Sequence, residues 1–246
     1  MTENAEGVAV WKAPVCPSVT GLPLQEGGAI LRRLTDVARA ARVPFDGSVD
    51  CYPPNLLIVE TADPEGLLQD WDNDNTRRLE TFNSATDDLF AGAPQSVIEK
   101  FITTPRAVRV WYYTHREDAA DLTVGDETSF GPPEVRVYEP TRIESHGVVY
   151  DFFRVFVIID EKRLQGVTIS QLADYVSMVG LAKLRPDAHL GDAPTILKLF
   201  DGAPQSAPSG MTPWDQAFLR SLYAADQKSV LQRSQIASAM ARDIAH

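Results

Sequence analysis

The stretch TISQLADYVSMVGLAK, residues 168–183, decides the fold that we expect for this chain. Thr168 can cap the start of a helix, and Gln171 can reach back to the backbone of Thr168 and close a capping box. Apolar and small residues then recur at steps of three and four, as in a helix that packs on one face: Ile169, Leu172, Ala173, Val176, Val179 and Gly180. A glycine inside a helix costs about 1 kcal/mol relative to alanine, so Gly180 indicates a helix end or a sharp turn. Pro186 ends the helix soon after.

The spacing of this helix resembles the active-site helix of the metzincin metallopeptidases, which carry the motif H-E-x-x-H-x-x-G-x-x-H. Aligned on Gly180, the chain reads A-D-Y-V-S-M-V-G-L-A-K. Ala173, Ser177 and Lys183 then stand at the three zinc-ligand positions, and Asp174 stands at the position of the general base. Zinc requires imidazole, thiolate or carboxylate ligands. We therefore expect no metal and no other cofactor, and the sequence favours a non-catalytic protein over a zinc peptidase.

The overall composition excludes several classes of partner. The chain has 246 residues, 44% of them hydrophobic, and a formal net charge of -11. This size and apolar content fit an ordinary globular protein. The negative charge argues against nucleic acid or an anionic membrane surface as the main partner. No apolar run is long enough to span a membrane or to form the core of a signal peptide.

The two cysteines, Cys16 and Cys51, lie in the first fifth of the chain, and each is close to proline. They are either two unrelated buried thiols or a disulfide that joins the N-terminal segment to the start of the next strand. We favour the disulfide, which would place the protein in an oxidising compartment. The expected location is therefore periplasmic or secreted, with an export signal that this sequence does not include.

The segments before the opening helix predict a sheet covered by helices. Strands are expected at residues 7–15, 55–61 and 106–114, and at 135–138 and 148–160 as a hairpin around a turn at residues 145–147. Helices are expected at residues 25–42, from Asp63 and Pro64 onward, at 72–92 on the surface, and at 94–101. Residues 117–133 form an acidic loop, which is either simply solvated or the rim of a groove.

The C-terminal part carries a second likeness to this family. Thr212, Pro213 and Asp215 have the pattern of a capped helix start, with an expected buried stripe of Trp214, Ala217, Phe218 and Leu222. Matrixin-like metzincins have a turn of the type S-I-M, then a loop and a helix of the type L-T-x-x-D-I-x-x-[IL]-x-x-L-Y. This chain is similar, with T-I-L at residues 195–197 and then residues 211–223, although Leu197 replaces the methionine of the turn. A last helix is expected at residues 229–244.

Together these segments resemble a metzincin or matrixin that lacks its zinc-binding histidines, and also an uncharacterised family of exported proteobacterial proteins. The resemblance implies a single zincin-like α+β domain over residues 1–246, with a mixed sheet and packed helices. It places a sheet-and-helix lobe at about residues 1–184 and an all-helical lobe at about 185–246. In metzincins the last strand of the mixed sheet leads into the active-site helix, and the strand predicted at 148–160 stands in that place.

Two functional hypotheses remain open from the sequence. The first is a non-catalytic exported protein that binds an unknown protein or a component of the cell envelope through the former substrate groove, with Tyr175 and His189 as possible groove residues. The alternative is a hydrolase with rearranged catalytic groups around Asp174 and His189. Ser177 and Lys183, six residues apart, fall on different helix faces and do not form a nucleophile pair. The neighbourhood of Ala173, Asp174, Ser177 and Lys183 distinguishes an open site from a filled one.

Overall fold

A computed structural model describes residues 8–48, 51–79, 90, 93–117, 149–184, 190–229 and 231–245. It is an α+β structure in which a four-stranded mixed sheet is combined with six helices among these residues. In chain order the elements are β1 (Pro17–Thr20), α1 (Leu24–Ala41), β2 (Leu56–Thr61), α2 (Pro64–Leu79), α3 (Gln95–Thr103), β3 (Val108–Glu117), β4 (Val149–Asp160), α4 (Ile169–Leu181), α5 (Pro213–Ala224) and α6 (Gln232–Ile244). Short 3-10 turns occupy η1 (Glu161–Arg163), η2 (Ile196–Phe200) and η3 (Pro204–Ser206).

The strands lie in the order β1-β2-β4-β3. β1 pairs with β2 and β2 pairs with β4 in parallel, whereas β3 pairs with β4 antiparallel along its whole length, from Val108 opposite Ile159 to Glu117 opposite Val149. The branched, apolar sequences of β2 and β4 predicted interior strands, and the structure confirms both positions. The partner strand predicted at 135–138 lies outside the described residues.

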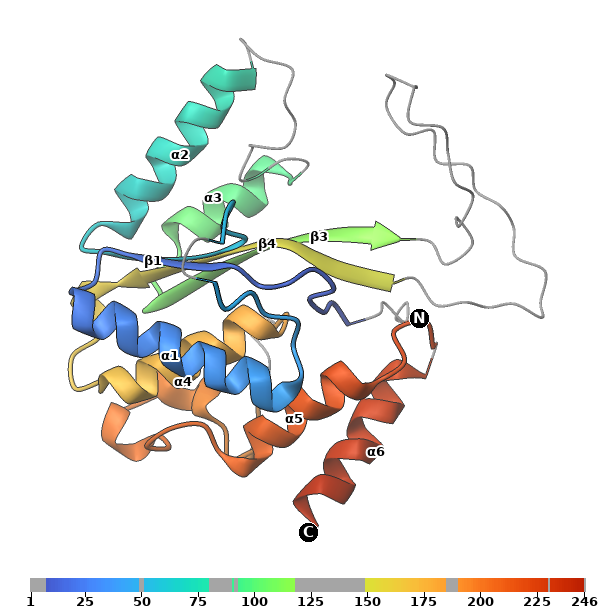
Figure 1. Cartoon of the computed structure of the whole chain (residues 1–246). Helices are drawn as coiled ribbons and strands as arrows, with labels where there is room; N and C mark the ends of the chain where they lie inside the picture. The colour runs from blue at the N-terminus through green and yellow to red at the C-terminus, as the bar shows by residue number, and fades with distance from the viewer. Residues whose placement is uncertain are drawn as a thin grey trace, which may run out of the picture.

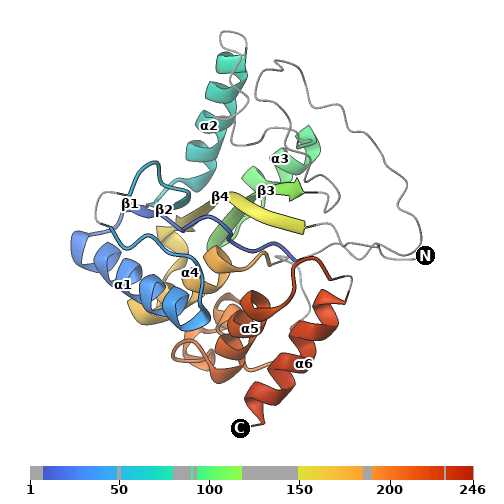
Figure 2. The ribbon, with the colours of Figure 1, turned by 45° about the vertical axis from the view of Figure 1, so that its right-hand side comes forward.

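Helices cover both faces of the sheet (Figure 1). α1 and α4 lie on one face and α2 and α3 on the other. Side chains alternate along β4, so Val155, Val157 and Ile159 join the core under α1 and α4, while Phe156 and Ile158 join the core under α2 and α3. α5 and α6 lie farther from the sheet, beyond α1 and α4 (Figure 2).

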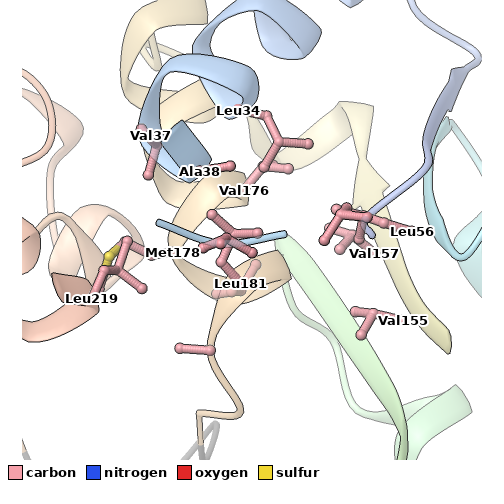
Figure 3. Packing of buried hydrophobic residues seen from close by; sticks show 14 of the residues in the cluster. Leu34, Val37, Ala38, Leu56, Val155, Val157, Val176, Met178, Leu181 and Leu219 are labelled. Carbon is pink, nitrogen blue, oxygen red and sulfur yellow. The ribbon is translucent and has the colours of Figure 1, made fainter. Parts of the chain in front are cut away.

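The larger core joins the N-terminal and C-terminal parts of the chain. Figure 3 shows Leu34 and Val37 of α1 meeting Val176 of α4, with Leu219 of α5 against Met178. The same cluster runs in sequence from Ala9 to Ile236. The helices that follow α4 therefore share one core with the sheet-bearing part, and all regular elements described after α4 are helical.

The strand predicted at residues 7–15 is wrong. This segment makes only isolated bridges, Val10 with Asp151 and Val15 with Phe45, and the first strand is β1. Its apolar residues are nevertheless buried, since Trp11 is 2% exposed. Pro14 lies within the segment and donates no backbone hydrogen bond, and the segment packs on the core without building a ladder of pairs.

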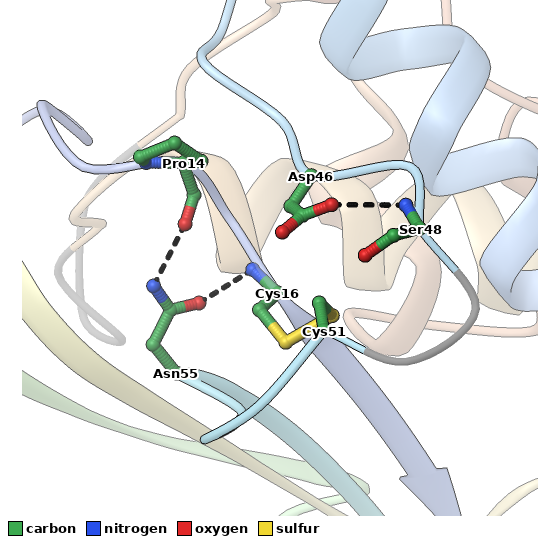
Figure 4. The surroundings of a disulfide bond; sticks show 6 residues. All are labelled: Pro14, Cys16, Asp46, Ser48, Cys51 and Asn55. Carbon is green, nitrogen blue, oxygen red and sulfur yellow. Dashed lines mark hydrogen bonds between the residues drawn. A yellow bond between two sulfur atoms is a disulfide. The ribbon is translucent and has the colours of Figure 1, made fainter.

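Cys16 and Cys51 form the predicted disulfide, with a Cα–Cα distance of 5.7 Å (Figure 4). It joins the start of β1 to the segment that enters β2. Asn55 reinforces the junction, because its Oδ1 accepts from the backbone N–H of Cys16 at 2.7 Å and its Nδ2 donates to the carbonyl of Pro14 at 3.0 Å. None of the helices in the described part of the chain has the length and apolar character needed to cross a membrane.

Removal of this disulfide tests how much the N-terminal segment depends on it. The bridge closes a loop of 35 residues in sequence separation, for which chain entropy predicts roughly 3–4 kcal/mol of stabilisation. The double variant Cys16→Ala/Cys51→Ala should lose that free energy of unfolding in urea. A reductant should destabilise the wild-type chain by a similar amount and leave the double variant unchanged. Equal stability of the two chains under oxidising conditions would contradict the expectation.

Candidate functional site

The candidate site is built on α4, and the structure confirms the predicted capping box at its start. The side chain of Thr168 accepts from the backbone N–H of Gln171, and the Gln171 side chain accepts from the backbone N–H of Thr168. Gln171 also donates through Nε2 to the carbonyls of Pro204 and Pro208, at 3.2 and 3.0 Å. The start of α4 is thereby tied to the loop before α5.

The C-terminal end of α4 is closed by three aromatic side chains from distant parts of the chain. The hydroxyl of Tyr112 lies 2.9 Å from the carbonyl of Val179 and 3.1 Å from that of Ala182. Trp11 Nε1 donates to the carbonyl of Gly180 at 2.9 Å, and the Tyr223 hydroxyl donates to that of Leu181 at 2.7 Å. The last carbonyls of a helix have no partner within it, so these contacts allow the helix end to be buried. Burial also raises the pKa of the Tyr112 and Tyr223 hydroxyls.

Gly180 is not the turning residue that the sequence indicated. It remains inside α4, and the chain changes direction at Ala182, whose backbone is extended. The glycine serves close packing, because a Cβ at this position would lie 3.2 Å from Cδ2 of Leu56 in β2. Gly180 therefore marks the face of α4 that lies against the sheet.

Two of the expected zinc-ligand positions lie on this same face. Residues seven apart in a helix share nearly one direction, so Ala173 points as Gly180 does, and Ser177 lies between them. Ala173 is 2% exposed and Ser177 is 0% exposed. The Ser177 hydroxyl donates to the carbonyl of Ala173 at 2.7 Å. Both residues are small side chains packed inside the core rather than groups that face a cleft.

The four positions do not converge on one point. Lys183 lies after the end of α4 and is exposed, away from the buried Ala173 and Ser177. Alanine has no donor atom, and the serine hydroxyl is used inside the helix. These residues do not fit a zinc ion. Among the described residues, no group of three or more His, Cys, Asp or Glu side chains is placed to hold a metal ion.

Asp174 is held in a network of three elements. It is 2% exposed. Its Oδ1 accepts from Nε of Arg33 in α1, and its Oδ2 accepts from the backbone N–H of Met211 at 2.7 Å. Gly210 leaves room for this arrangement, since a Cβ there would lie 2.6 Å from Oδ2. The carboxylate ties α4 to α1 and to the segment that leads into α5.

Of the two possible groove residues, Tyr175 and His189, the structure describes only Tyr175. Tyr175 is packed edge-on against Phe200 of η2, with ring centroids 4.9 Å apart. Burial, and secondarily the negative charge of Asp201, raises the pKa of Tyr175 to about 12. His189 lies outside the described residues. Tyr175 is thus part of the contact between α4 and η2, and the structure does not describe a groove that joins it to His189.

The residues with the matrixin-like pattern are connected through Asp215, which is fully buried. Asp215 accepts from the hydroxyl of Thr195 and from the backbone N–H groups of Ile196 and Thr212. The capping box predicted for Thr212 and Asp215 is confirmed. The buried stripe of α5 is wrong in part, because Leu219 takes the buried place expected for Phe218. Phe218 instead stacks on Trp214, both half-buried, with centroids 6.0 Å apart.

A small pocket lies between α1 and α5, beside the Asp174 network. Its volume is about 140 Å³. Arg33 and Met211, the two partners of Asp174, form part of its lining, and Arg220 of α5 contributes a second guanidinium. This pocket adjoins the candidate site, and nothing in the sequence pattern indicated it, because its walls come from segments about 170 residues apart.

A buried cation lies on the opposite face of the sheet from α4. Arg109 of β3 is 4% exposed, and its Nε and Nη1 have no hydrogen-bond partner in the described part of the chain. Loss of solvent lowers the pKa of this guanidinium, and the negative charge of Asp160 partly offsets the effect.

The comparisons with known proteins do not identify the chain: no protein-family model, no curated protein and no solved structure matches it. The functional interpretation therefore depends on the geometry described above.

The aromatic closure of α4 can be tested at one hydroxyl. Tyr112→Phe removes the group that lies against the Val179 and Ala182 carbonyls and should lower the free energy of unfolding by about 1–2 kcal/mol. Tyr150→Phe is the matched control, because the Tyr150 hydroxyl makes no hydrogen bond with the residues that the structure describes. Equal effects of the two substitutions in urea unfolding would show that the hydroxyl of Tyr112 does not stabilise the helix end.

The Asp174 network can be tested by a double-mutant cycle with Gly210. A methyl group at residue 210 collides with Asp174 Oδ2, so Gly210→Ala should destabilise the wild-type chain by about 2 kcal/mol. In an Asp174→Ala background the same substitution should cost much less, which gives a clear coupling energy. Gly47→Ala is the control, since a Cβ there meets nothing within 4 Å. Additive effects of the two substitutions would rule out the contact.

Proposed function

We propose that this chain is a non-catalytic, exported binding protein built on a zincin-like scaffold. The order of elements supports the scaffold: β4, in the interior of a mixed sheet, leads through η1 into α4, and the T-I-L segment and α5 follow. The buried disulfide junction supports export, because disulfides persist in oxidising compartments. The partner that we propose is a protein or a component of the cell envelope.

The packing of α4 is the observation that carries the non-catalytic part of this proposal. The positions of two zinc ligands are filled by small residues packed toward the sheet, and the third, Lys183, lies on the surface. A larger imidazole at residue 173 or 177 would have to displace core side chains, which destabilises a close-packed interior. The face of α4 that a metallopeptidase would present to its substrate serves here as core.

The contacts of Asp174 give no support to the alternative hydrolase. A general base must reach the reacting proton, either directly or through one water. Both carboxylate oxygens of Asp174 already accept hydrogen bonds, and the side chain is almost closed to solvent. Asp174 is a positioning group for α1 and for the segment before α5 in this arrangement.

Metal analysis and a peptidase assay on the purified chain test the proposal directly. We expect less than one zinc per ten chains after incubation with zinc and gel filtration, and no cleavage of casein or of a mixed peptide library, because the ligand positions supply no donor set. Substitution of Asp174 and of His189 should leave any residual hydrolysis unchanged. One tightly held zinc per chain together with peptidase activity would overturn the proposal.

A further inference from the structure

The pocket between α1 and α5 holds two arginines that are each fixed on one edge by a carboxylate. Arg33 Nε donates to Asp174, and Arg220 donates through Nε to Asp243 at 2.8 Å, with Nη2 at 2.7 Å. In the described part of the chain, no residue accepts from either Nη of Arg33 or from Nη1 of Arg220. Both side chains are partly open to solvent, at 39% and 41% exposure.

A guanidinium that is held by a carboxylate on one edge can still bind an anion through the N–H groups of its other edge. Arginine presents its N–H groups in a planar fork that matches a carboxylate. A side chain that is already held in place loses less conformational freedom when it binds. The two free edges therefore indicate a carboxylate as the charged part of a ligand.

The rest of the lining narrows the ligand class. Val37, Ala41 and Leu219 are buried and give the pocket an apolar wall. Asp36 also lines the pocket and is largely exposed; its Oδ1 accepts from Arg39, which leaves Oδ2 as an acceptor for a ligand. A residue at the C-terminal end of a polypeptide combines an α-carboxylate, an aliphatic side chain and a backbone N–H that needs an acceptor. An internal Asp or Glu residue carries its carboxylate on the side chain, so the same residue has no aliphatic side chain to place against the apolar wall.

We infer that this pocket binds the free C-terminal residue of a partner polypeptide, with its α-carboxylate on Arg33 and Arg220 and a small aliphatic side chain against Val37, Ala41 and Leu219. Sites for whole drug-sized ligands measure about 300–1,000 Å³, whereas this pocket measures about 140 Å³. It therefore has room for one small residue, and the preceding residues leave between α1 and α5. This inference rests on the proposed binding function and names the chemical group that is bound.

The experiment is a titration of the ¹⁵N-labelled full chain, followed by NMR, with the peptide acetyl-Gly-Gly-Ala-Val. The free-acid peptide should shift backbone amides of α1 and α5 around the pocket in a saturable manner. The same peptide with a C-terminal amide should bind at least about tenfold more weakly, because it loses the charge-assisted hydrogen bonds. Free valine, the third ligand, should also bind more weakly, because its ammonium group replaces the acetylated peptide chain.

Three variants separate the pocket from general surface charge. Arg220→Gln should weaken binding of the free-acid peptide by about tenfold, and Ala40→Leu should abolish it by filling the pocket from an exposed helix position. Arg32→Gln is the control, because Arg32 is also an exposed arginine of α1 but does not line the pocket. Thermal unfolding of each variant checks that the fold is intact.

Several results would overturn the inference. They are equal binding of the free acid and the amide, equal loss of binding in Arg32→Gln and Arg220→Gln, shifts that map away from α1 and α5, or binding of free valine in preference to the peptide. The absence of any saturable change in amide chemical shift at millimolar peptide would also overturn the inference. These outcomes are independent of the zinc and peptidase measurements, so the pocket can fail while the non-catalytic proposal stands.

Discussion

The burial of α4 is the constraint on which the rest of the structure depends. Ten of its thirteen residues are buried, and a buried helix leaves polar groups at both ends that water cannot reach. Here the partners of those groups come from the N-terminal segment, β3, α5 and the loop around η3. α4 therefore fixes the relative positions of segments that are far apart in sequence, and each of those segments contributes one side chain or carbonyl to it.

Asp174, in the middle of the helix, is likewise a buried polar group whose partners come from other elements. A buried carboxylate is costly unless it is paired and hydrogen-bonded, so its two donors must stay in place once it is enclosed. One donor is a side chain of α1 and the other a backbone N–H just before α5. This requirement aligns the three elements, and it also positions Arg33 at the pocket between α1 and α5. A polar group in the core thus determines the geometry of a concavity on the surface.

Local patterns in the sequence predicted α1, β2, β4, α4 and α5 well, because each is specified by its own periodicity and caps. The strand at residues 7–15 failed, since the apolar residues around Trp11 indicate burial but not backbone pairing. The aromatic closure of α4 and the Arg33–Asp174 pair could not be predicted, because they join residues 42 to 169 positions apart. Gly180 was ambiguous for the same reason: a glycine at a helix end reads as a turn unless the neighbouring strand is known. The sequence therefore singled out Ala173, Asp174 and Ser177 without revealing that they are buried.

The same inward orientation has a consequence for where binding can occur. Ala173 and Ser177 are buried, and a Cβ at Gly180 would lie 3.2 Å from Leu56 of β2, so this face of α4 packs closely against the sheet. Charged and polar side chains of α1 and α5 that could bind a ligand lie at the pocket instead, around an apolar wall. Arg33 belongs to both regions, because its Nε donates to Asp174 and its side chain lines the pocket. A ligand that binds the Nη groups of Arg33 would also affect the Arg33–Asp174 hydrogen bond, which holds α1 to α4. Occupancy of the pocket and rigidity of this contact should therefore be coupled.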